Sequence, residues 1–258
     1  MSQPLSCLLV IPCYNEAARF RADSFAEFLH GHGNVSFLFV NDGSSDATLS
    51  VLQQFCALHA GRASVLDLQP NGGKGEAVRQ GLIQGMAAAT AAYTGFWDAD
   101  LATPLDALPE FMHVLEHEPE IDVVFGARIR LLGRHVSRNP MRHYAGRVFA
   151  TAVSLSLQLP IYDTQCGAKV FRVTPLLLRV LAEPFESRWI FDVEVLARYL
   201  AAWRLQGAHP EDKLYELPLQ TWVDVAGSKL RAVDFARSFT DLIKIRREFV
   251  HLMHASKS

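Results

Sequence analysis

Short apolar segments alternate with amphipathic ones through the first half of the chain, and this alternation restricts the fold more than any other feature. Each apolar run is short enough to be a buried strand and ends at turn-forming residues. Because strand and helix alternate with short connections, the sequence predicts an α/β fold with a mainly parallel central sheet and helices on both faces. The predicted strands are residues 7–11, 35–40, 64–68, 93–97 and 122–125, and the predicted helices are 16–30, 46–59, 75–89 and 105–116.

The second half of the chain has a less regular pattern. A helix is predicted at residues 139–159, basic at its start and apolar later, followed by a strand at 168–172 and a helix at 189–199. Residues 214–222 are predicted to be extended, and 230–251 to form a helix with the basic segment KIRRE. We find no internal repeat or convincing linker, so the sequence favours a single domain over residues 1–258.

The composition narrows the class of function. The net charge of −2 gives no global basic field, so no nucleic-acid partner is expected. The four cysteines lack CxxC spacing and are interpreted as reduced thiols of a cytoplasmic protein. No apolar run approaches the roughly 18–20 residues that a spanning helix needs. We therefore expect a cytoplasmic protein, soluble or peripheral on the cytoplasmic face of a membrane.

The segment GFWDADL carries the strongest chemical signal. Asp98 and Asp100 come directly after a predicted strand, with only the small residue Ala99 between them. Two carboxylates in this position can bind one Mg²⁺ or Mn²⁺, which prefers oxygen ligands and keeps coordination positions open for phosphate oxygens. Two solvated acids in a turn are the alternative. At the carboxyl end of a strand, however, the pair lies where ligands bind in such folds.

The polar clusters PCYNE, NDGSSD and DAD all follow predicted strands and are expected to converge at one edge of the sheet. In NDGSSD, Asn41 or Asp42 can accept hydrogen bonds from a nucleobase or ribose. In NGGKGEA, two glycines allow the backbone to approach a ligand, and Lys74 can meet a phosphate at the start of a helix. A glycine turn with a helix cap is the alternative for both NDGSSD and NGGKGEA.

The PCYNE segment after the first predicted strand adds three candidate donor-site residues, Pro12, Tyr14 and Glu16. Tyr14 can stack on a base, and Glu16 can bind a ribose hydroxyl. An ordinary loop is the alternative.

Taken in order, IPCYNE, VNDGSSDAT, NGGKGEAVRQGL and DADLATP resemble the nucleotide-binding half of family 2 glycosyltransferases, which have the GT-A fold. The second half is more specific. GAR, DTQCGAKVFR, RWIFDVEVL and GSKL resemble the polyprenyl-phosphate sugar transferases of the dolichyl-phosphate β-glucosyltransferase type. One departure is the pair Asn41 and Asp42, where the family usually has two acids.

The resemblance implies an inverting, metal-dependent hexosyltransferase that moves glucose from UDP-glucose onto a polyprenyl phosphate. It makes residues 1–127 the nucleotide-binding half, and residues 128–258 the acceptor-binding half with a C-terminal helix. A GDP-mannose donor and a saccharide or other hydroxyl acceptor stay open alternatives. A non-catalytic nucleotide-sugar binding protein is the alternative from another class. The oligomeric state is left open.

A phosphate monoester acceptor is already anionic at pH 7, so it needs cations for placement more than a strong general base. The candidate cations are Arg128, Arg138, Arg142 and Lys229, with Arg128 favoured because it follows a strand end. We expect Arg128 and the metal-binding Asp100 to take part in catalysis. A surface charge is the alternative for each of the four cations.

Four residues of the second half are candidates for the sugar pocket. Asp192, flanked by Trp189 and Phe191, can act as the base for a hydroxyl acceptor, or can hold the sugar or order the arginines. Gln165 and Cys166 belong to the DTQCG motif and are expected to line the pocket, with Trp189 nearby. Cys166 is not needed as a nucleophile for inversion, and a packed small side chain is its favoured role.

The helix predicted at 139–159 is a candidate membrane-surface element. Its basic start would meet anionic head groups, and Val148, Phe149, Val153, Leu155 and Leu157 would meet the acyl boundary. The KIRRE segment would add a second electrostatic contact. A core helix with a basic end is the alternative.

Overall fold

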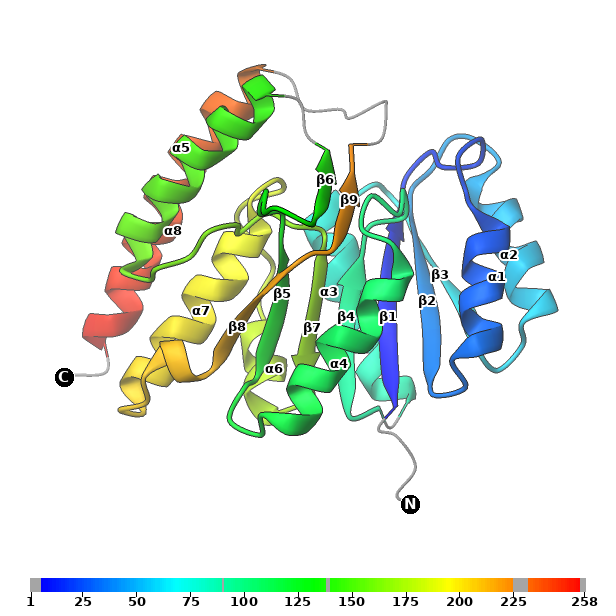
Figure 1. Cartoon of the computed structure of the whole chain (residues 1–258), viewed down its shortest axis with the longest axis horizontal. Coiled ribbons are helices and arrows are strands. Elements are labelled where there is room, and N and C mark those ends of the chain that lie inside the picture. Colours follow the sequence, from blue (N-terminus) through cyan, green and yellow to red (C-terminus); the bar gives the residue numbers. More distant parts are fainter. Residues whose placement is uncertain (1–5, 90, 138–139, 225–231, 256–258) are drawn as a thin grey trace.

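A seven-stranded sheet runs through the centre of the computed structural model, which describes residues 6–89, 91–137, 140–224 and 232–255 (Figure 1). The strand order is β3–β2–β1–β4–β7–β5–β8, and neighbours are parallel except that β7 is antiparallel to both β4 and β5. The predicted α/β class with a mainly parallel sheet is confirmed. The strands are β1 (Cys7–Cys13), β2 (Val35–Asp42), β3 (Ala63–Leu68), β4 (Tyr93–Trp97), β5 (Val123–Ala127), β7 (Ala168–Arg172) and β8 (Leu214–Pro218).

A second, two-stranded sheet lies above the carboxyl ends of the central strands in Figure 1. It pairs β6 (His135–Ser137) with β9 (Thr221–Val223) in parallel. The segment predicted to be extended at 214–222 is therefore two strands. The chain leaves the central sheet after β8, where the Leu219 amide donates to the Ala127 carbonyl (3.0 Å) and Gln220 accepts from His135.

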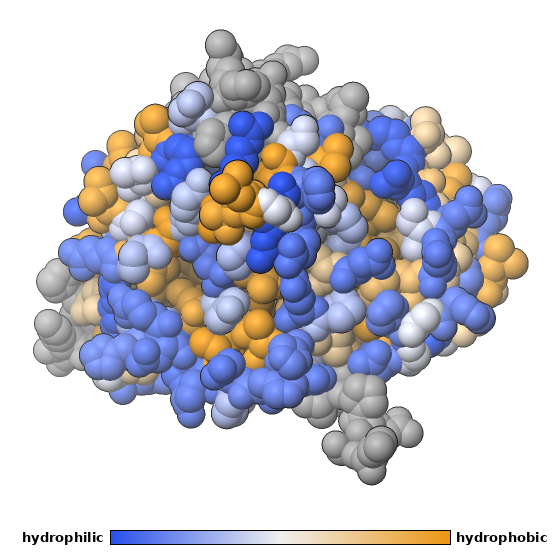
Figure 2. Space-filling model, viewed as in Figure 1, coloured by the Kyte–Doolittle hydropathy of each residue, from blue (hydrophilic) through white to orange (hydrophobic). Residues whose placement is uncertain are grey.

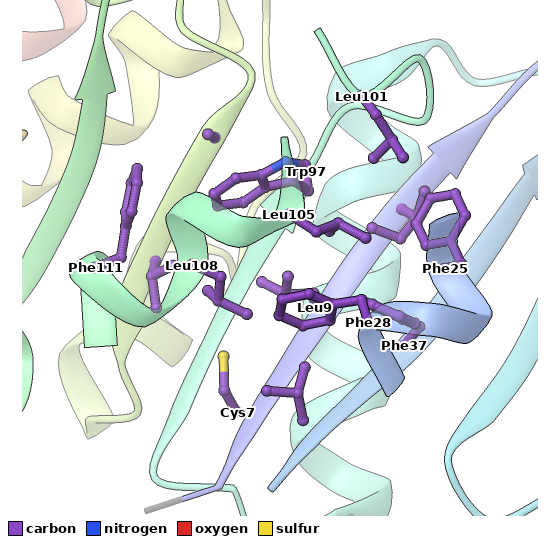
Figure 3. Packing of buried hydrophobic residues seen from close by; sticks show 14 of the residues in the cluster. Cys7, Leu9, Phe25, Phe28, Phe37, Trp97, Leu101, Leu105, Leu108 and Phe111 are labelled. Atoms are coloured by element: carbon purple, nitrogen blue, oxygen red, sulfur yellow. The ribbon is translucent and has the colours of Figure 1, made fainter. Parts of the chain in front are cut away.

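Helices cover both faces of the sheet, and alternate residues of each strand point to opposite sides. One buried cluster joins the sheet to α1, α2 and α4, and it includes Leu9, Phe25, Phe37 and Trp97 (Figure 3). The other cluster joins the opposite face to α3, α5, α6, α7 and α8. The helices are α1 (Ala22–Gly31), α2 (Thr48–Leu58), α3 (Lys74–Ala88), α4 (Leu108–His117), α5 (Pro140–Leu157), α6 (Pro175–Val180), α7 (Phe191–Leu205) and α8 (Ala232–Ala255), with 3-10 turns at Leu105–Ala107 and Pro210–Asp212.

The first helix starts later than predicted. It was expected from residue 16, but α1 begins at Ala22, and residues 17–19 form a turn. The amides of Glu16 and Ala17 both donate to the Thr48 hydroxyl, at 2.8 and 3.1 Å, and the Ala17 amide also donates to Asp46. These contacts from a distant loop bind the PCYNE segment beside α2, which the local pattern could not predict.

Of the α5 residues that were predicted to meet a membrane, some are buried and others are exposed. Phe149, Val153 and Leu157 are at most 2% exposed and belong to the core, as the core-helix alternative expects. Val148 and Leu155 are 62% and 72% exposed and face outward. Within the described ranges, no helix combines the length and the hydrophobicity that crossing a membrane requires.

Candidate functional site

Asp98 and Asp100 follow β4 on a strained turn. Leu101 has a φ of 53°, a left-handed conformation that a bulky side chain rarely adopts. Its side chain is only 7% exposed and reaches into the buried cluster of Figure 3, and its amide donates to the Asp98 carbonyl (3.1 Å). The Ala102 amide donates to Oδ1 of Asp100 (3.0 Å). Strain of this kind persists only where the surroundings enforce it, and it is common at functional sites.

Lys74, the first residue of α3, meets the carboxylate pair. Its Nζ lies 2.5 Å from Oδ1 of Asp98. Burial lowers the pKa of Lys74, but the negative charges of Asp98, Asp192 and Asp100 outweigh this effect and raise the pKa overall. The lysine is therefore a permanent cation at the point where the two acids converge. This contact brings the start of α3 to the end of β4.

Gly167 leaves the space that the Asp98 carboxylate occupies. The Asp98 amide donates to the Gly167 carbonyl (2.9 Å), and a Cβ at position 167 would overlap the carboxyl group. The antiparallel strand β7 begins directly after this glycine. The DTQCG motif thus shapes the surroundings of Asp98 through a glycine, at a position where no other residue fits without displacing Asp98.

The carboxylate pair suits a hard divalent cation such as Mg²⁺ or Mn²⁺. The described residues contain no group of three or more histidine, cysteine or acidic side chains that could hold a metal by themselves. Such a cation would complete its shell with phosphate oxygens and water, as Mg²⁺ commonly does. Burial, followed by the charge of Asp98, raises the pKa of Asp100, and a bound cation would relieve that repulsion. The donor set therefore fits the ion.

Asp42 organises the loop that precedes α3. Its Oδ1 accepts from the Gly72 amide (2.7 Å), and its Oδ2 accepts from the Gly73 amide and the Asn71 side chain (both 2.9 Å). Gly73 has a φ of 90°, a conformation that favours glycine. Asp42 is only 2% exposed, so its oxygens fix the loop that presents Lys74. The contact of Asp42 with a base or ribose stays a prediction.

Asn41 is the better placed of the two neighbours for a ligand. Its Nδ2 donates to Asp67 (2.7 Å), and its buried Oδ1 has no hydrogen-bond partner in the described part of the chain. A buried acceptor without a partner is costly unless a ligand or water satisfies it. A nucleobase N–H would satisfy it, so this contact stays our prediction for Asn41.

The PCYNE loop lies beside these residues. The Asn15 amide donates to the Ser44 hydroxyl (3.0 Å), and the Ser45 amide donates to the Asn15 side chain (2.9 Å). Tyr14 is 40% exposed, and Glu16 accepts from Arg19 (2.6 Å). Stacking of Tyr14 on a base stays a prediction. Pro12, just before this loop, lies in β1 and faces Val40 of β2 in the strand register.

Asp192 lies in the first turn of α7 and is 5% exposed. Lys169 Nζ lies 2.8 Å from its Oδ1 and also donates to the Cys166 carbonyl (2.7 Å). Phe191, the neighbour of Asp192, packs against Gly75, the neighbour of Lys74, so the start of α7 lies close to the Lys74–Asp98 pair. The structure therefore brings Asp192 to the site, in an ion pair that the sequence did not reveal. Its action as a base stays a prediction.

Arg128 forms a bidentate ion pair with Asp163. Its Nε and Nη2 donate to the two carboxylate oxygens at 2.6 and 2.7 Å, and its backbone amide donates to Oδ2 (3.1 Å). Burial lowers the pKa of Arg128, but the charge of Asp163 raises it well above the ordinary value. Nη1 makes none of these contacts. Arg128 also lines a small pocket together with Gly146, Arg147, Phe149, Ala150, Tyr162, Asp163, Thr164 and Gln165.

The remaining sugar-site candidates are placed differently. Gln165 lines the small pocket beside Arg128, and its role at the sugar stays a prediction. Cys166 is fully buried and its Sγ lies 3.9 Å from the Thr103 hydroxyl, so it does not line an open pocket. Burial raises the pKa of the Cys166 thiol to about 11, which agrees with the favoured role as a packed side chain. Trp189 is 41% exposed before α7, and Ala99 is 6% exposed, so only its backbone can serve a ligand.

Three predicted acceptor residues cannot be placed. Arg138 and Lys229 lie outside the described residues, and Arg142 falls in α5 at a position whose side chain is outside the description. Arg147 of α5, in contrast, donates to the Tyr162 carbonyl (2.7 Å) and lies over the Tyr162 ring (3.6 Å).

Four residues at the site were missed from the sequence. Asp163 and Lys169 belong to the quoted DTQCGAKVFR motif, and a search for an acid and a base within that motif would have found them. Asn71 holds the NGG loop through its hydrogen bonds to Asp42. Arg188 donates to the Asn71 carbonyl (3.3 Å) and packs against Gly73, so the RW motif reaches the loop before α3.

Comparison with known proteins adds independent evidence. The sequence model described as Glycosyl transferase family 2 matches residues 8–177. The chain is 32% identical over 247 residues to a dolichyl-phosphate beta-glucosyltransferase of Drosophila melanogaster, covering 89% of this chain and 70% of the relative. It is 28% identical over 263 residues to the enzyme of that name from Saccharomyces cerevisiae, covering 94% and 74%.

Solved structures with the same fold include glucosyl-3-phosphoglycerate synthase from Mycobacterium tuberculosis. Its complex with phosphoglyceric acid has a TM-score of 0.65 and 16% identity, covering 94% of this chain and 80% of that one. Another crystal structure of that enzyme, with Mn²⁺, UDP-glucose and phosphoglyceric acid, has a TM-score of 0.61 and 17% identity, with the same coverage. At this identity the likeness shows the shared fold alone.

Proposed function

The chain belongs to glycosyl transferase family 2, and on that basis we propose that it transfers glucose from UDP-glucose to a polyprenyl phosphate of the dolichyl type. One observation carries the proposal. Asp98, Asp100 and Lys74 converge at the end of β4, beside a loop that Asp42 holds in place. Two acids and a fixed cation at this edge suit a metal-bound diphosphate. The names of the curated relatives support the choice of sugar and acceptor.

The donor end uses residues from three strand ends. Tyr14 would stack on the base, Asn41 Oδ1 would accept from it, and Asp98 and Asp100 would hold Mg²⁺ or Mn²⁺ on the diphosphate. When bound, the cation would supply Lewis-acid stabilisation of the charge that develops on the leaving UDP. Lys74 adds a second positive charge at the same point. A structural neighbour crystallised with Mn²⁺ and UDP-glucose supports this assignment.

The acceptor end needs a cation but no strong base. An oxygen of the polyprenyl phosphate would attack the anomeric carbon as the bond to the UDP oxygen breaks on the opposite face, which inverts the configuration. Arg128 can point Nη1 toward the incoming phosphate while Asp163 holds the rest of its guanidinium. The hydroxyl of Thr164 lines the same pocket, is 1% exposed and has no partner within the described residues. It could donate to a phosphate oxygen.

We test this function with a transfer assay. The protein is incubated with Mn²⁺, radiolabelled UDP-glucose and polyprenyl phosphate, and the label that enters the organic phase is counted. Metal-dependent transfer is the expected result, with less label from GDP-mannose and none without the lipid. Label in a water-soluble glucoside of an added saccharide, with no organic product, would favour the hydroxyl-acceptor alternative. Tight metal-dependent donor binding without transfer or hydrolysis would favour a binding protein.

A lipid acceptor requires the protein to reach a bilayer, and α5 offers a suitable face. Tyr144, Val148 and Leu155 are 71%, 62% and 72% exposed and fall on one side of the helix. Hydrophobic residues also reach the surface along α5 in the space-filling view (Figure 2). We therefore include peripheral docking through this stripe in the proposal.

Replacing Leu155 by glutamate is expected to weaken binding to vesicles of phosphatidylcholine and phosphatidylglycerol by about tenfold, because a buried leucine contributes about 1.5–3 kcal/mol. Co-sedimentation measures this. Leu58, which is 82% exposed at the end of α2, provides the matched control, and Leu58→Glu should bind normally. Equal binding by both variants would remove the α5 stripe from the proposal.

A further inference from the structure

Lys169 is a charged side chain with 1% of its surface exposed, and the mechanism above gives it no role. Lysine is almost never buried unless it is paired. Its Nζ lies 2.8 Å from Asp192 Oδ1, donates to the Cys166 carbonyl (2.7 Å) and lies 5.3 Å from the centre of the Phe96 ring. All these contacts come from residues at the end of the sheet that carries the site.

The lysines of two ion pairs both approach the Phe96 ring. Lys169 faces Phe96 across the β4–β7 register, and Lys74 approaches the same ring at 6.0 Å. Lys74 is paired with Asp98, and Lys169 with Asp192. The start of α7 also reaches the start of α3, since Phe191 packs against Gly75. The Asp192 pair therefore lies next to the carboxylates that are expected to hold the donor diphosphate.

This placement suggests what Asp192 meets. In UDP-glucose the hexose is bonded directly to the diphosphate. Its hydroxyl groups therefore lie close to the carboxylate pair when the diphosphate is bound there. A carboxylate in the first turn of α7 is favoured by the helix dipole and can accept hydrogen bonds from sugar hydroxyls. Oδ1 contacts Lys169, and no hydrogen bond or ion pair to Oδ2 occurs among the described residues, so Oδ2 can serve this purpose.

We propose that Lys169 is a positioning residue that holds Asp192 in the orientation that binds the hydroxyl groups of the donor hexose. The inference rests on the proposed function, since it assumes a nucleotide sugar at this edge of the sheet. Without Lys169, the buried Asp192 carboxylate would lose the cation that it contacts, and it would turn away from the sugar toward water. This change would weaken recognition of the sugar and leave the nucleotide contacts intact.

A purely structural pair, which only ties β7 to α7, is the alternative. It predicts a loss of stability but no selective effect on the sugar. Arg172 provides a matched control because it lies on the same strand, faces Tyr93 of β4 in the register and lies over that ring at 5.6 Å. Arg172 sits at the far end of β7, where it donates to carbonyls of residues 115, 118 and 121.

The experiment compares the affinities of UDP and UDP-glucose by calorimetry with saturating Mn²⁺, in the wild type and in Lys169→Met, Asp192→Asn and Arg172→Met. We expect Lys169→Met and Asp192→Asn to weaken UDP-glucose binding at least about tenfold while UDP binding changes less than about twofold. Arg172→Met should leave the ratio of the two affinities unchanged. If Lys169→Met does not fold, the double variant Lys169→Met/Asp192→Asn, which has no unpaired charge in this pair, replaces it.

The possible outcomes distinguish a positioning role of Lys169 from a purely structural one. An unchanged affinity ratio in the Lys169 variants, or the same change in Arg172→Met, would make the pair structural and overturn the inference. A double variant that loses no more sugar affinity than Asp192→Asn alone would support it, because Lys169 would then act through Asp192. Failure of the proposed function is separate, because the wild-type protein itself would then bind neither UDP nor UDP-glucose.

Discussion

Replacing Asp98 or Asp100 by alanine is expected to lower the turnover number by at least about 10²-fold. The two carboxylates are the only candidates for the metal among the described residues at the carboxyl end of β4, and Lys74 alone cannot bridge the two phosphates. Loss of either acid would leave the growing charge on the leaving UDP poorly stabilised. Steady-state transfer of labelled glucose, measured across a range of Mn²⁺ concentrations, gives the turnover number.

The control for this prediction is Asp106→Ala. Asp106 is an exposed acid in the 3-10 turn that follows the same loop, and it makes no contact with the carboxylate pair. It should retain normal turnover. Near-normal activity of Asp98→Ala or Asp100→Ala would remove that residue from the site, and a metal requirement that persisted in both variants would place the cation elsewhere.

Replacing Arg128 by alanine is expected to raise the Michaelis constant for polyprenyl phosphate by about 10- to 100-fold, with the constant for UDP-glucose changed less than about twofold. The guanidinium is held by two hydrogen bonds to Asp163, which fix the direction of the remaining N–H groups. Because it lines the pocket with Arg147 and Thr164, its loss should affect the phosphate acceptor more than the donor. Initial rates with each substrate varied in turn measure the two constants.

The same change also breaks a buried ion pair, which typically costs about 3–5 kcal/mol of stability. Thermal unfolding of the variant must therefore be measured alongside the kinetics. Arg128→Lys separates the two effects, since it keeps a charge near Asp163 but loses the planar, two-pronged geometry. Arg204→Ala is the control, because Arg204 donates to the carbonyls of Leu157 and Gln158 and does not line the pocket. A defect in Arg128→Ala that appears only on the donor side would contradict the placement.

The strands and their order along the chain could be predicted because each buried strand is a short apolar run. The position of β7 could not. Residues 168–172 pair with β4 and β5 in an antiparallel sense, and nothing in the local pattern specifies partners that lie so far away in the sequence. The predicted start of α1 was wrong for a related reason. Thr48 and Asp46 accept hydrogen bonds from the backbone amides of residues 16 and 17, which precede α1.

In the candidate site, too, some features could be predicted from the sequence and others could not. The strand ends that carry PCYNE, NDGSSD and DAD were predicted to share one edge of the sheet, and the parallel register of β1 with β2 and β4 places them there. The sequence pattern did not specify the contact of Lys74 with Asp98, or the hydrogen bonds by which both oxygens of Asp42 hold the 71–73 loop. Cys166 was expected in a pocket wall, but it packs against Thr103 and beneath Gly126 in the core. These differences arise because a polar residue's partner is set by tertiary packing.

Two ion pairs, Arg128 with Asp163 and Lys169 with Asp192, show most clearly what the sequence could not predict. Each joins residues more than twenty positions apart, and each partner taken alone reads as an ordinary charged residue. Composition and periodicity give no information on such pairs. The quoted motifs contain all four residues, so the motif resemblance located the region of the site without assigning the partners.

The central claim is that a cation held by Asp98 and Asp100 binds the diphosphate of the donor. Its most direct test is thermal unfolding of the wild type and of Asp98→Ala with UDP-glucose, in the presence of Mn²⁺ or of EDTA. A ligand at about 100 times its dissociation constant adds about 2.7 kcal/mol of stability, which corresponds to a rise of several degrees. We predict that rise for the wild type with Mn²⁺ only, and none for Asp98→Ala. An equal rise with EDTA, or in the variant, would contradict the claim.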